Sequence, residues 1–344
     1  MTPKATRPLS TTRRQFIAGV GAAALAAAFL AACGEDEDPE ASPTSTSMTS
    51  TATPTGTPGT RIVSHSLGES EVPAEPKCVV ALGEEWMLSD LLSLGIQPLA
   101  SSASGPEVSF LGGVTSLYDV GEVEALSNSE PDFERITALE PDLIITSTVV
   151  AENLGDGLGL LQEIAPVVAV PVAGPDFRAE YRTFAAVFGK EATAEERLAE
   201  YDSAVAEAKA DIPEGVTTSV ASIFDPNYIR VYVAPGSTLV DVLVDLGVAL
   251  DPDEEALPAT LSAGRSEITG EQVNLLQGDH VILLQSEAFD EATVVESVEA
   301  LPLWQTLPAA QSGQVHVVDR FAHPGVAGRI QAVKDLGAIF AGGE

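Results

Sequence analysis

Residues 130–146 read E-P-D-F-E-R-I-T-A-L-E-P-D-L-I-I-T, a stretch that joins one helix to one buried strand. Pro131 stands just ahead of a helical pattern over residues 133–139, and proline favours the first turn of a helix. The apolar run over residues 142–146 then predicts a strand that is buried on both faces. A helix followed by such a strand is the repeating unit of an α/β protein.

The same alternation continues on both sides of this stretch. Apolar runs predict strands at residues 79–82, 98–101 and 167–170, and amphipathic runs predict helices at residues 84–94 and 158–164. A strand–helix–strand succession implies a mostly parallel sheet with helices on both faces.

Residues 176–212 break this rhythm, because aromatic and charged residues alternate there without a proline. We expect one long linking helix, or two helices joined near Gly189. Beyond it the alternation resumes, with strands at residues 220–224, 229–233, 281–285 and 315–318, and helices at residues 238–246, 302–307 and 328–340. The sequence thus predicts two parallel-sheet α/β lobes, residues 61–175 and 213–344, joined by one long helix.

Residues 1–32 have the parts of an export signal. Arg13-Arg14 precedes an apolar run that closes on L-A-A-C at residues 30–33. The pattern resembles a bacterial twin-arginine lipoprotein signal, in which Cys33 is lipidated and anchors the chain to the outer face of the cytoplasmic membrane. The alternative is a membrane-spanning anchor, for which the alanine-rich run is short and weakly apolar. Residues 33–60, rich in Ser, Thr, Pro and Gly, predict a disordered tether.

The chain is strongly acidic, with 51 Asp+Glu against 17 Lys+Arg and a net charge of −34. Such a surface repels nucleic acid, so we expect no nucleic-acid partner. The acidity otherwise indicates solubility and identifies no ligand. Of the two cysteines, Cys33 is the proposed lipid site, which leaves Cys78 without a disulfide partner.

Several motifs agree in order and spacing with one family. They are H-S-L-G-E-S-E-V-P-A-E-P-K-C-V-V-A-L at residues 65–82, the stretch at residues 130–145, L-Q-E-I-A-P-V-V at 161–168, I-T-G-E-Q-V-N-L-L at 268–276 and L-P-L-W-Q-T-L-P-A-A-Q-S-G-Q-V-H-V-V-D at 301–319. Over residues 61–340 the chain resembles the class III periplasmic-binding proteins, lipoproteins that deliver ferric siderophores, haem or cobalamin to ABC importers. The resemblance implies a ligand cleft between the lobes, a monomer, no resident cofactor and an ABC-transporter permease as partner.

The resemblance also implies two permease-docking residues, Glu134 in P-D-F-E-R-I and Glu271 in T-G-E-Q-V. A carboxylate on each lobe can accept a bidentate arginine of the permease, which fixes orientation as well as adding attraction. Both residues could instead be first-turn glutamates that the helix dipole favours.

Candidate ligand-binding residues follow the predicted strands, since ligands of open α/β sheets bind beyond the carboxyl ends of the strands. Aromatic faces and guanidinium groups suit a small-molecule metal chelate. The candidates are Trp86, Tyr228, Arg230, Arg265 and Arg320. Trp86 could instead pack into its lobe, and Arg230 could point outward from its strand.

Other functions are less well supported by the sequence. The four histidines lack the spacing of a metal site, although His323 could ligate haem iron. No nucleophile elbow, zinc-protease or phosphate-loop motif indicates an enzyme, and no β-rich repeat indicates an adhesin. We expect a substrate-binding protein for a ferric siderophore, with cobalamin or haem as alternative ligands. The negative charge favours a neutral or cationic hydroxamate-type chelate over an anionic catecholate.

Overall fold

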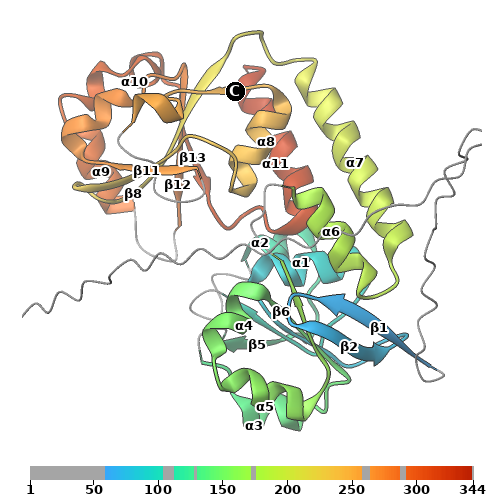
Figure 1. Ribbon diagram of the computed structural model, residues 1–344. Helices are drawn as coiled ribbons and strands as arrows, with labels where there is room; N and C mark the ends of the chain where they lie inside the picture. The colour runs from blue at the N-terminus through green and yellow to red at the C-terminus, as the bar shows by residue number, and fades with distance from the viewer. Residues whose placement is uncertain are drawn as a thin grey trace, which may run out of the picture. The chain divides into compact units, whose positions relative to one another are not determined.

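The computed structural model describes residues 59–103, 112–127, 130–171, 176–257, 264–286 and 292–342. The proposed signal, Cys33 and nearly all of the tether lie outside these ranges. The described residues form two sheets, each flanked by helices, as the sequence predicts (Figure 1). Among the helices described, none is long and apolar enough to cross a membrane.

The first sheet holds five parallel strands in the order β5-β4-β3-β6-β7. Its strands are β3 (Val79–Leu82), β4 (Ala100–Ala103), β5 (Glu124–Ser127), β6 (Leu143–Ser147) and β7 (Val167–Val170). Every residue of β3, β6 and β7 is buried, because helices cover both faces. This confirms the expected parallel α/β lobe.

Alternate strand residues of this sheet supply two separate cores. Val79 and Ala81 pack with α1 (Glu85–Ser93) and α6 (Phe177–Ala186), whereas Val80 and Leu82 pack on the opposite face. The helices on that opposite face are α3 (Phe133–Ala138), α4 (Thr148–Leu154) and α5 (Gly157–Ile164). A further short helix, α2 (Gly112–Leu117), contacts α1.

A hairpin of β1 (Thr60–His65) and β2 (Gly68–Pro73) covers the edge of this sheet at β7. The backbone N–H of Ser66 donates to the carbonyl of Ala169, and the N–H of Ala169 donates to Nδ1 of His65 at 3.2 Å. The hairpin thereby satisfies backbone groups that an edge strand would otherwise leave open to other chains.

The second sheet is mixed, which corrects the expectation of a parallel sheet in this lobe. Its strand order is β11-β9-β8-β12-β13, and β10 pairs with β8. Strand β9 runs antiparallel to both of its neighbours, β8 and β11, and a tight turn joins β8 to β9. Strands β10, β12 and β13 run parallel to β8. The bounds are β8 (Thr217–Asp225), β9 (Tyr228–Tyr232), β10 (Ala249–Leu250), β11 (Arg265–Ile268), β12 (His280–Gln285) and β13 (Val315–Asp319).

Helices cover both faces of the second sheet as well. On one face α8 (Thr238–Leu246) and α11 (Gly325–Phe340) share a core with Val220 and Ile282. On the other face the core includes Ala221 and Ile223. The elements there are η1 (Glu254–Ala256), η2 (Gly270–Leu275), α9 (Ala292–Glu299), η4 (Trp304–Thr306) and α10 (Pro308–Ser312).

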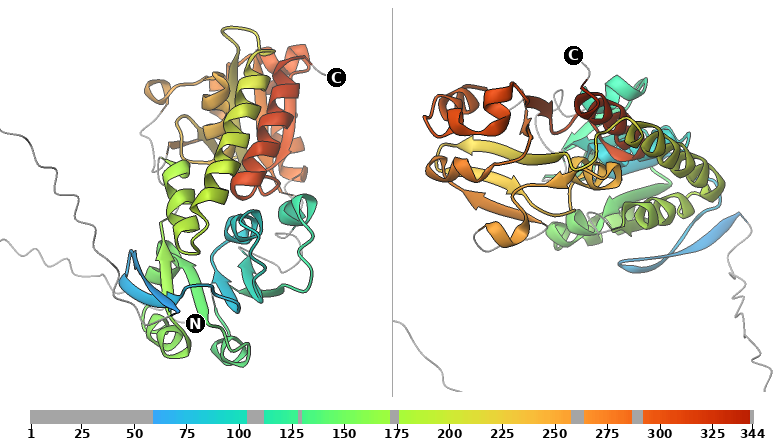
Figure 2. Two further views of the ribbon diagram at one scale, coloured as in Figure 1. Left: turned by 90° about the vertical axis from the view of Figure 1, so that its right-hand side faces the viewer. Right: turned by 90° about the horizontal axis from the view of Figure 1, so that it is seen from above.

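The segment between the sheets consists of two helices, α6 and α7 (Glu191–Lys209), rather than one long helix. They are interrupted at Gly189, whose φ of 63° lies in the left-handed region that only glycine adopts without strain. Figure 2 shows α7 running alongside α11, which it contacts along its length.

Candidate ligand-binding site

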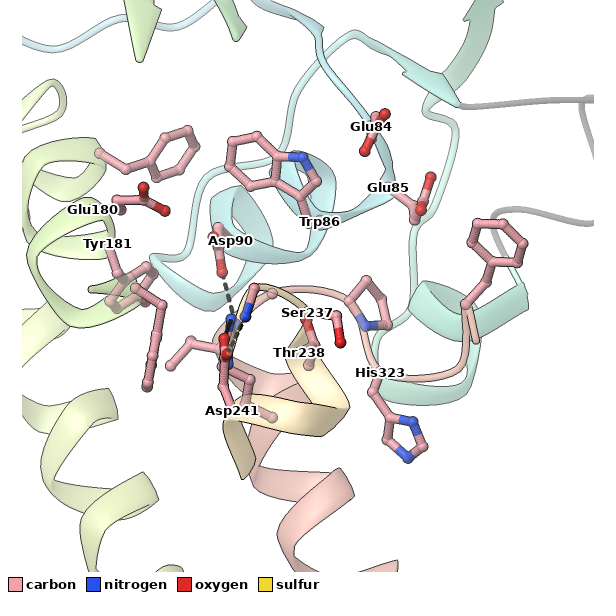
Figure 3. A pocket seen from close by; sticks show the side chains of 18 of the residues that line it. Glu84, Glu85, Trp86, Asp90, Glu180, Tyr181, Ser237, Thr238, Asp241 and His323 are labelled. Atoms are coloured by element: carbon pink, nitrogen blue, oxygen red, sulfur yellow. Dashed lines mark hydrogen bonds and ion pairs between the residues drawn. The ribbon is translucent and has the colours of Figure 1, made fainter. Parts of the chain in front are cut away.

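A cavity of about 270 Å³ opens between the two sheets, where loops from both lobes converge (Figure 3). It lies beyond the carboxyl ends of β3, β7, β9 and β13, the position at which open α/β sheets bind ligands. The residues that line it are Glu84, Glu85, Trp86, Asp90, Pro171, Phe177, Glu180, Tyr181, Phe184, Gly236, Ser237, Thr238, Asp241, Arg320, Phe321, His323, Pro324, Gly325, Val326 and Arg329.

An aromatic wall forms one side of the cavity. Trp86 packs edge-on against Phe184 at a ring-centroid distance of 6.1 Å, and both side chains rest on the core of the first lobe. Phe177 stands at the start of α6 and carries the guanidinium of Arg329 at 4.0 Å from its ring centroid. These rings offer a flat apolar surface whose faces attract cations.

The turn from β3 into α1 brings two carboxylates to the cavity. Glu84 occupies the N-cap position of α1, but its side chain makes no capping hydrogen bond. Glu84 is exposed, and partial desolvation by the surrounding protein raises its pKa. Glu85, the next residue, is buried.

Asp90 is buried where the two lobes meet. Its Oδ1 accepts a hydrogen bond of 2.8 Å from the backbone N–H of Val326, and Ser89 Oγ donates to the carbonyl of Pro324 at 2.7 Å. Burial raises the pKa of Asp90 to about 7, although the Val326 N–H and Arg329 oppose that rise. A helix of the first lobe thereby caps the N-terminus of α11 in the second.

A guanidinium and a carboxylate from two helices pair at the cavity wall. Arg329 Nη2 on α11 donates to Asp241 Oδ2 on α8 at 3.0 Å, and both side chains are mostly buried. The other carboxylate oxygen of Asp241 accepts the backbone N–H of Gly236 at 3.0 Å. The pair holds the start of α8 beside the start of α11.

A second cluster of arginine and aromatic side chains adjoins the cavity through Arg320. Two guanidinium groups lie near the ring of Phe224, with Arg230 at 4.9 Å and Arg320 at 5.2 Å from its centroid. Tyr228 stacks on the same ring at 5.2 Å, and its hydroxyl oxygen accepts a 2.6 Å hydrogen bond from Arg230. Residues two apart on β9 share one face of the sheet, which is why Tyr228 and Arg230 meet.

The five candidate ligand-binding residues divide into three groups. Trp86 and Arg320 line the cavity, and Tyr228 and Arg230 join it through Phe224. Arg265 lies farther along the same face, with its guanidinium 5.7 Å from the ring centroid of Tyr232, and does not line the cavity. Their contacts with a ligand remain predictions. The segments that follow β4 and β12, residues 104–111 and 287–291, lie outside the described residues.

Sequence reasoning missed several lining residues, namely Phe177, Glu180, Asp241 and Arg329. The candidates were taken from segments that follow strands, whereas Arg329 lies within the helix predicted at residues 328–340 and still lines the cavity. The available signal was the position of each residue in the first or second turn of a helix that follows a strand, namely α6 after β7, α8 after β9 and α11 after β13.

The histidines make other contacts. His323 is buried and its Nε2 pairs with Asp335 at 2.8 Å, and in Figure 3 its ring points away from the aromatic wall. His280 and His316 stack on each other, 3.2 Å apart between Nδ1 and Nε2, at the opposite end of the second sheet. Within the described residues, no group of three or more His, Cys, Asp or Glu side chains could hold a metal ion.

The two candidate docking residues are both exposed. Glu134 lies in the first turn of α3 on the first lobe, and Glu271 lies in the first turn of η2 on the second.

Comparison with known proteins decides the family. A family model described as periplasmic binding protein matches residues 99–320. The chain belongs to this family. It is 28% identical over 265 residues to a putative ABC transporter substrate-binding lipoprotein of Bacillus subtilis, covering 75% of this chain and 80% of that protein. It is also 28% identical over 261 residues to the iron(3+)-hydroxamate-binding protein of the same organism, covering 73% and 76%.

Solved structures agree with this assignment. A periplasmic binding protein component of a ferrichrome ABC transporter from Bacillus subtilis superposes with a TM-score of 0.68 at 23% identity, covering 81% of this chain and 99% of that one. A siderophore-binding protein from Vibrio cholerae, solved with Fe³⁺-Desferal, gives a TM-score of 0.62 at 25% identity, covering 77% and 98%. The two-lobed α/β fold is therefore that of a substrate-binding protein.

Proposed function

We propose that this chain is the substrate-binding component of an ABC importer and captures a ferric siderophore between its two lobes. The observation that carries the proposal is the cavity lined by Trp86, Phe177 and two arginines, in a chain of the periplasmic binding protein family. Relatives that align over three quarters of the chain are named as binding proteins for Fe³⁺-hydroxamate and Fe³⁺-citrate.

Capture requires recognition without chemistry. Flat rings bury the apolar parts of a chelate, and guanidinium groups donate to its metal-bound oxygens. Arg230 and Arg320, which both lie near the ring of Phe224, would donate to the metal-bound oxygens. Trp86 and Tyr228 would supply the flat rings. The iron is cargo in this account, so we propose no resident cofactor and no enzymatic reaction.

Delivery requires a partner in the membrane. We propose that Glu134 and Glu271 dock the two lobes onto arginines of the permease, and that lipidated Cys33 keeps the chain at the outer face of the cytoplasmic membrane. The protein would act there as a monomer, on a tether formed by residues 33–60. Its net charge of −34 argues against a nucleic-acid partner.

Calorimetric titration of the full chain tests this function. The panel holds ferrioxamine B, a ferric tris-catecholate, cyanocobalamin, haemin, and free ferric and zinc ions. We expect saturable binding of a ferric chelate with a Kd of about 1 μM or tighter and no comparable binding of the free ions. Binding of cobalamin or haemin alone would replace the siderophore as the substrate, and binding of nothing on the panel would contradict the proposal.

A further inference from the structure

The cavity is lined by more acidic than basic residues. Five carboxylate residues line it, and only two arginines oppose them. One of those arginines, Arg329, is already paired with Asp241. Carboxylates thus outnumber guanidinium groups in the lining, although burial raises the pKa of Asp90 to about 7. A cationic group on a chelate would reduce the repulsion among them.

The carboxylates lie around the aromatic wall. In the view of Figure 3, the indole of Trp86 lies between Glu180 on one side and Glu84 and Glu85 on the other. An aromatic ring with carboxylates on neighbouring residues attracts an organic cation, because the ring quadrupole and the charges act together.

Among these carboxylates, Glu84 is the one that we expect to contact a cationic group. It sits at an N-cap position but caps nothing, and among the described residues its side chain has no hydrogen-bond or ion-pair partner. An exposed carboxylate at the mouth of the cavity, next to the indole of Trp86, can pair with a cationic group of the ligand.

Arg329 indicates that the ligand also carries hydrogen-bond acceptors. Its side chain is 12% exposed and lines the cavity. Its Nη1 is buried without a hydrogen-bond partner in the described part of the chain. A buried N–H without an acceptor is costly, so the cavity offers a donor to chelate oxygens as well as an anionic wall to a cation.

We propose that the cavity selects ferric chelates that carry a protonated amine, with the ammonium group against Trp86 beside Glu84 and the iron-bound oxygens toward Arg320 and Arg329. This inference rests on the proposed siderophore-binding function and specifies its substrate class. The cation is an organic ammonium group rather than a bare metal ion, because the described residues hold no cluster of three metal-ligating side chains.

Two chelates that differ in one group test the inference. Ferrioxamine B ends in a protonated amine, and N-acetyl-ferrioxamine B carries a neutral amide there with the same tris-hydroxamate iron centre. Titrated calorimetrically into the full chain, ferrioxamine B should bind at least about tenfold more tightly, as expected for a cation at a partly desolvated aromatic site. Equal affinity, or preference for the acetylated chelate, would overturn the inference.

Variants locate the effect. Glu84→Gln should reduce the preference at least about threefold and leave the affinity for N-acetyl-ferrioxamine B within about twofold of the unmodified chain. Glu196→Gln removes an exposed carboxylate on α7 outside the cavity and should change neither affinity. An equal loss for both chelates in Glu84→Gln would contradict a role in cation recognition.

The same titrations separate this inference from the function on which it rests. If neither ferrioxamine binds but another ferric chelate of the panel does, the siderophore-binding function stands and the ammonium preference is wrong. If no chelate binds, both fail together.

Discussion

Asp90 lies at the point where a helix of the first lobe meets a helix of the second. Its carboxylate accepts the N–H of Val326, and a Cβ on the intervening Gly325 would come within 2.5 Å of Asp90 Oδ1. The contact joins residues 236 positions apart, so no local pattern could reveal it. Helix α11 begins at Gly325, where Asp90 accepts a free N–H group of the first turn, whereas the sequence predicts a start at Gly328.

The raised pKa of Asp90 makes the stability contribution of this residue pH-dependent. Its folded pKa of about 7 lies above the ordinary value of 3.8. The folded state therefore keeps a proton that the unfolded state has lost, and this contribution is full below about pH 4 and is lost as the pH rises through 7. The groups that face Asp90 are Arg329, Glu180, Tyr118 and Tyr181.

We predict that Asp90→Asn is more stable than the unmodified chain at pH 8 and equally stable at pH 4. The amide keeps an acceptor for Val326 and carries no charge to bury, so the gain is at most about 4 kcal/mol, at about 1.4 kcal/mol per pKa unit. Urea unfolding at pH 4, 6 and 8 measures it. Asp156→Asn, at an exposed carboxylate that makes no capping bond, should show no such trend. A variant that is less stable at pH 8 would mean that the charged form of Asp90 is the favoured one.

Among the elements, buried strands were the easiest to predict. The observed bounds of β3 and β7 coincide with the predicted residues 79–82 and 167–170, because strands covered on both faces read as unbroken apolar runs. The hairpin of β1 and β2 carries no such run, since it covers a sheet edge rather than filling a core. The antiparallel strand β11 reads R-S-E-I, without an apolar run, and its pairing with β9 depends on contacts distant in sequence.

Substitution by alanine should have opposite effects on stability at two helical glycines. A Cβ at Gly113 in α2 would lie 2.0 Å from the carbonyl oxygen of Phe321, whereas Gly159 in α5 has open space around it. Gly113→Ala should destabilise the chain by about 2 kcal/mol or more, because backbone must shift where the lobes meet. Gly159→Ala should stabilise it by about 0.5–1 kcal/mol through helix propensity.

The free energy of unfolding in urea compares the two variants. Similar values for both would contradict the close contact of α2 with the segment that leads into α11.

At the scale of the whole molecule, the binding site combines parts that sequence reasoning found and parts that it could not. Trp86 and Arg320 were identified because they follow strands, and the carboxyl ends of strands meet at a cleft. Phe177, Asp241 and Arg329 reach the same cavity from helices. Their convergence depends on how the linking segment and α11 cross between the lobes, which no local spacing encodes.

Docking to the permease can be separated from ligand capture. Glu134→Lys and Glu271→Lys reverse the charge of exposed first-turn residues outside the cavity lining. We predict unchanged chelate affinity in vitro and at least about a tenfold loss of radiolabelled iron uptake by cells that carry the double variant as their only copy, since like charges would then face the permease arginines. Uptake unchanged relative to a Glu196→Lys control would contradict the docking role.

The proposed function requires a ferric chelate to bind in the cavity between the lobes, in contact with Trp86. The chain has two tryptophans, and Trp304 is buried in the core of the second lobe. In a Trp304→Phe variant, Trp86 alone reports on the cavity. Titration with ferrioxamine B should quench Trp86 fluorescence saturably, with a midpoint that matches the calorimetric Kd. Calorimetric binding with no change at Trp86 would place the ligand elsewhere and contradict the account.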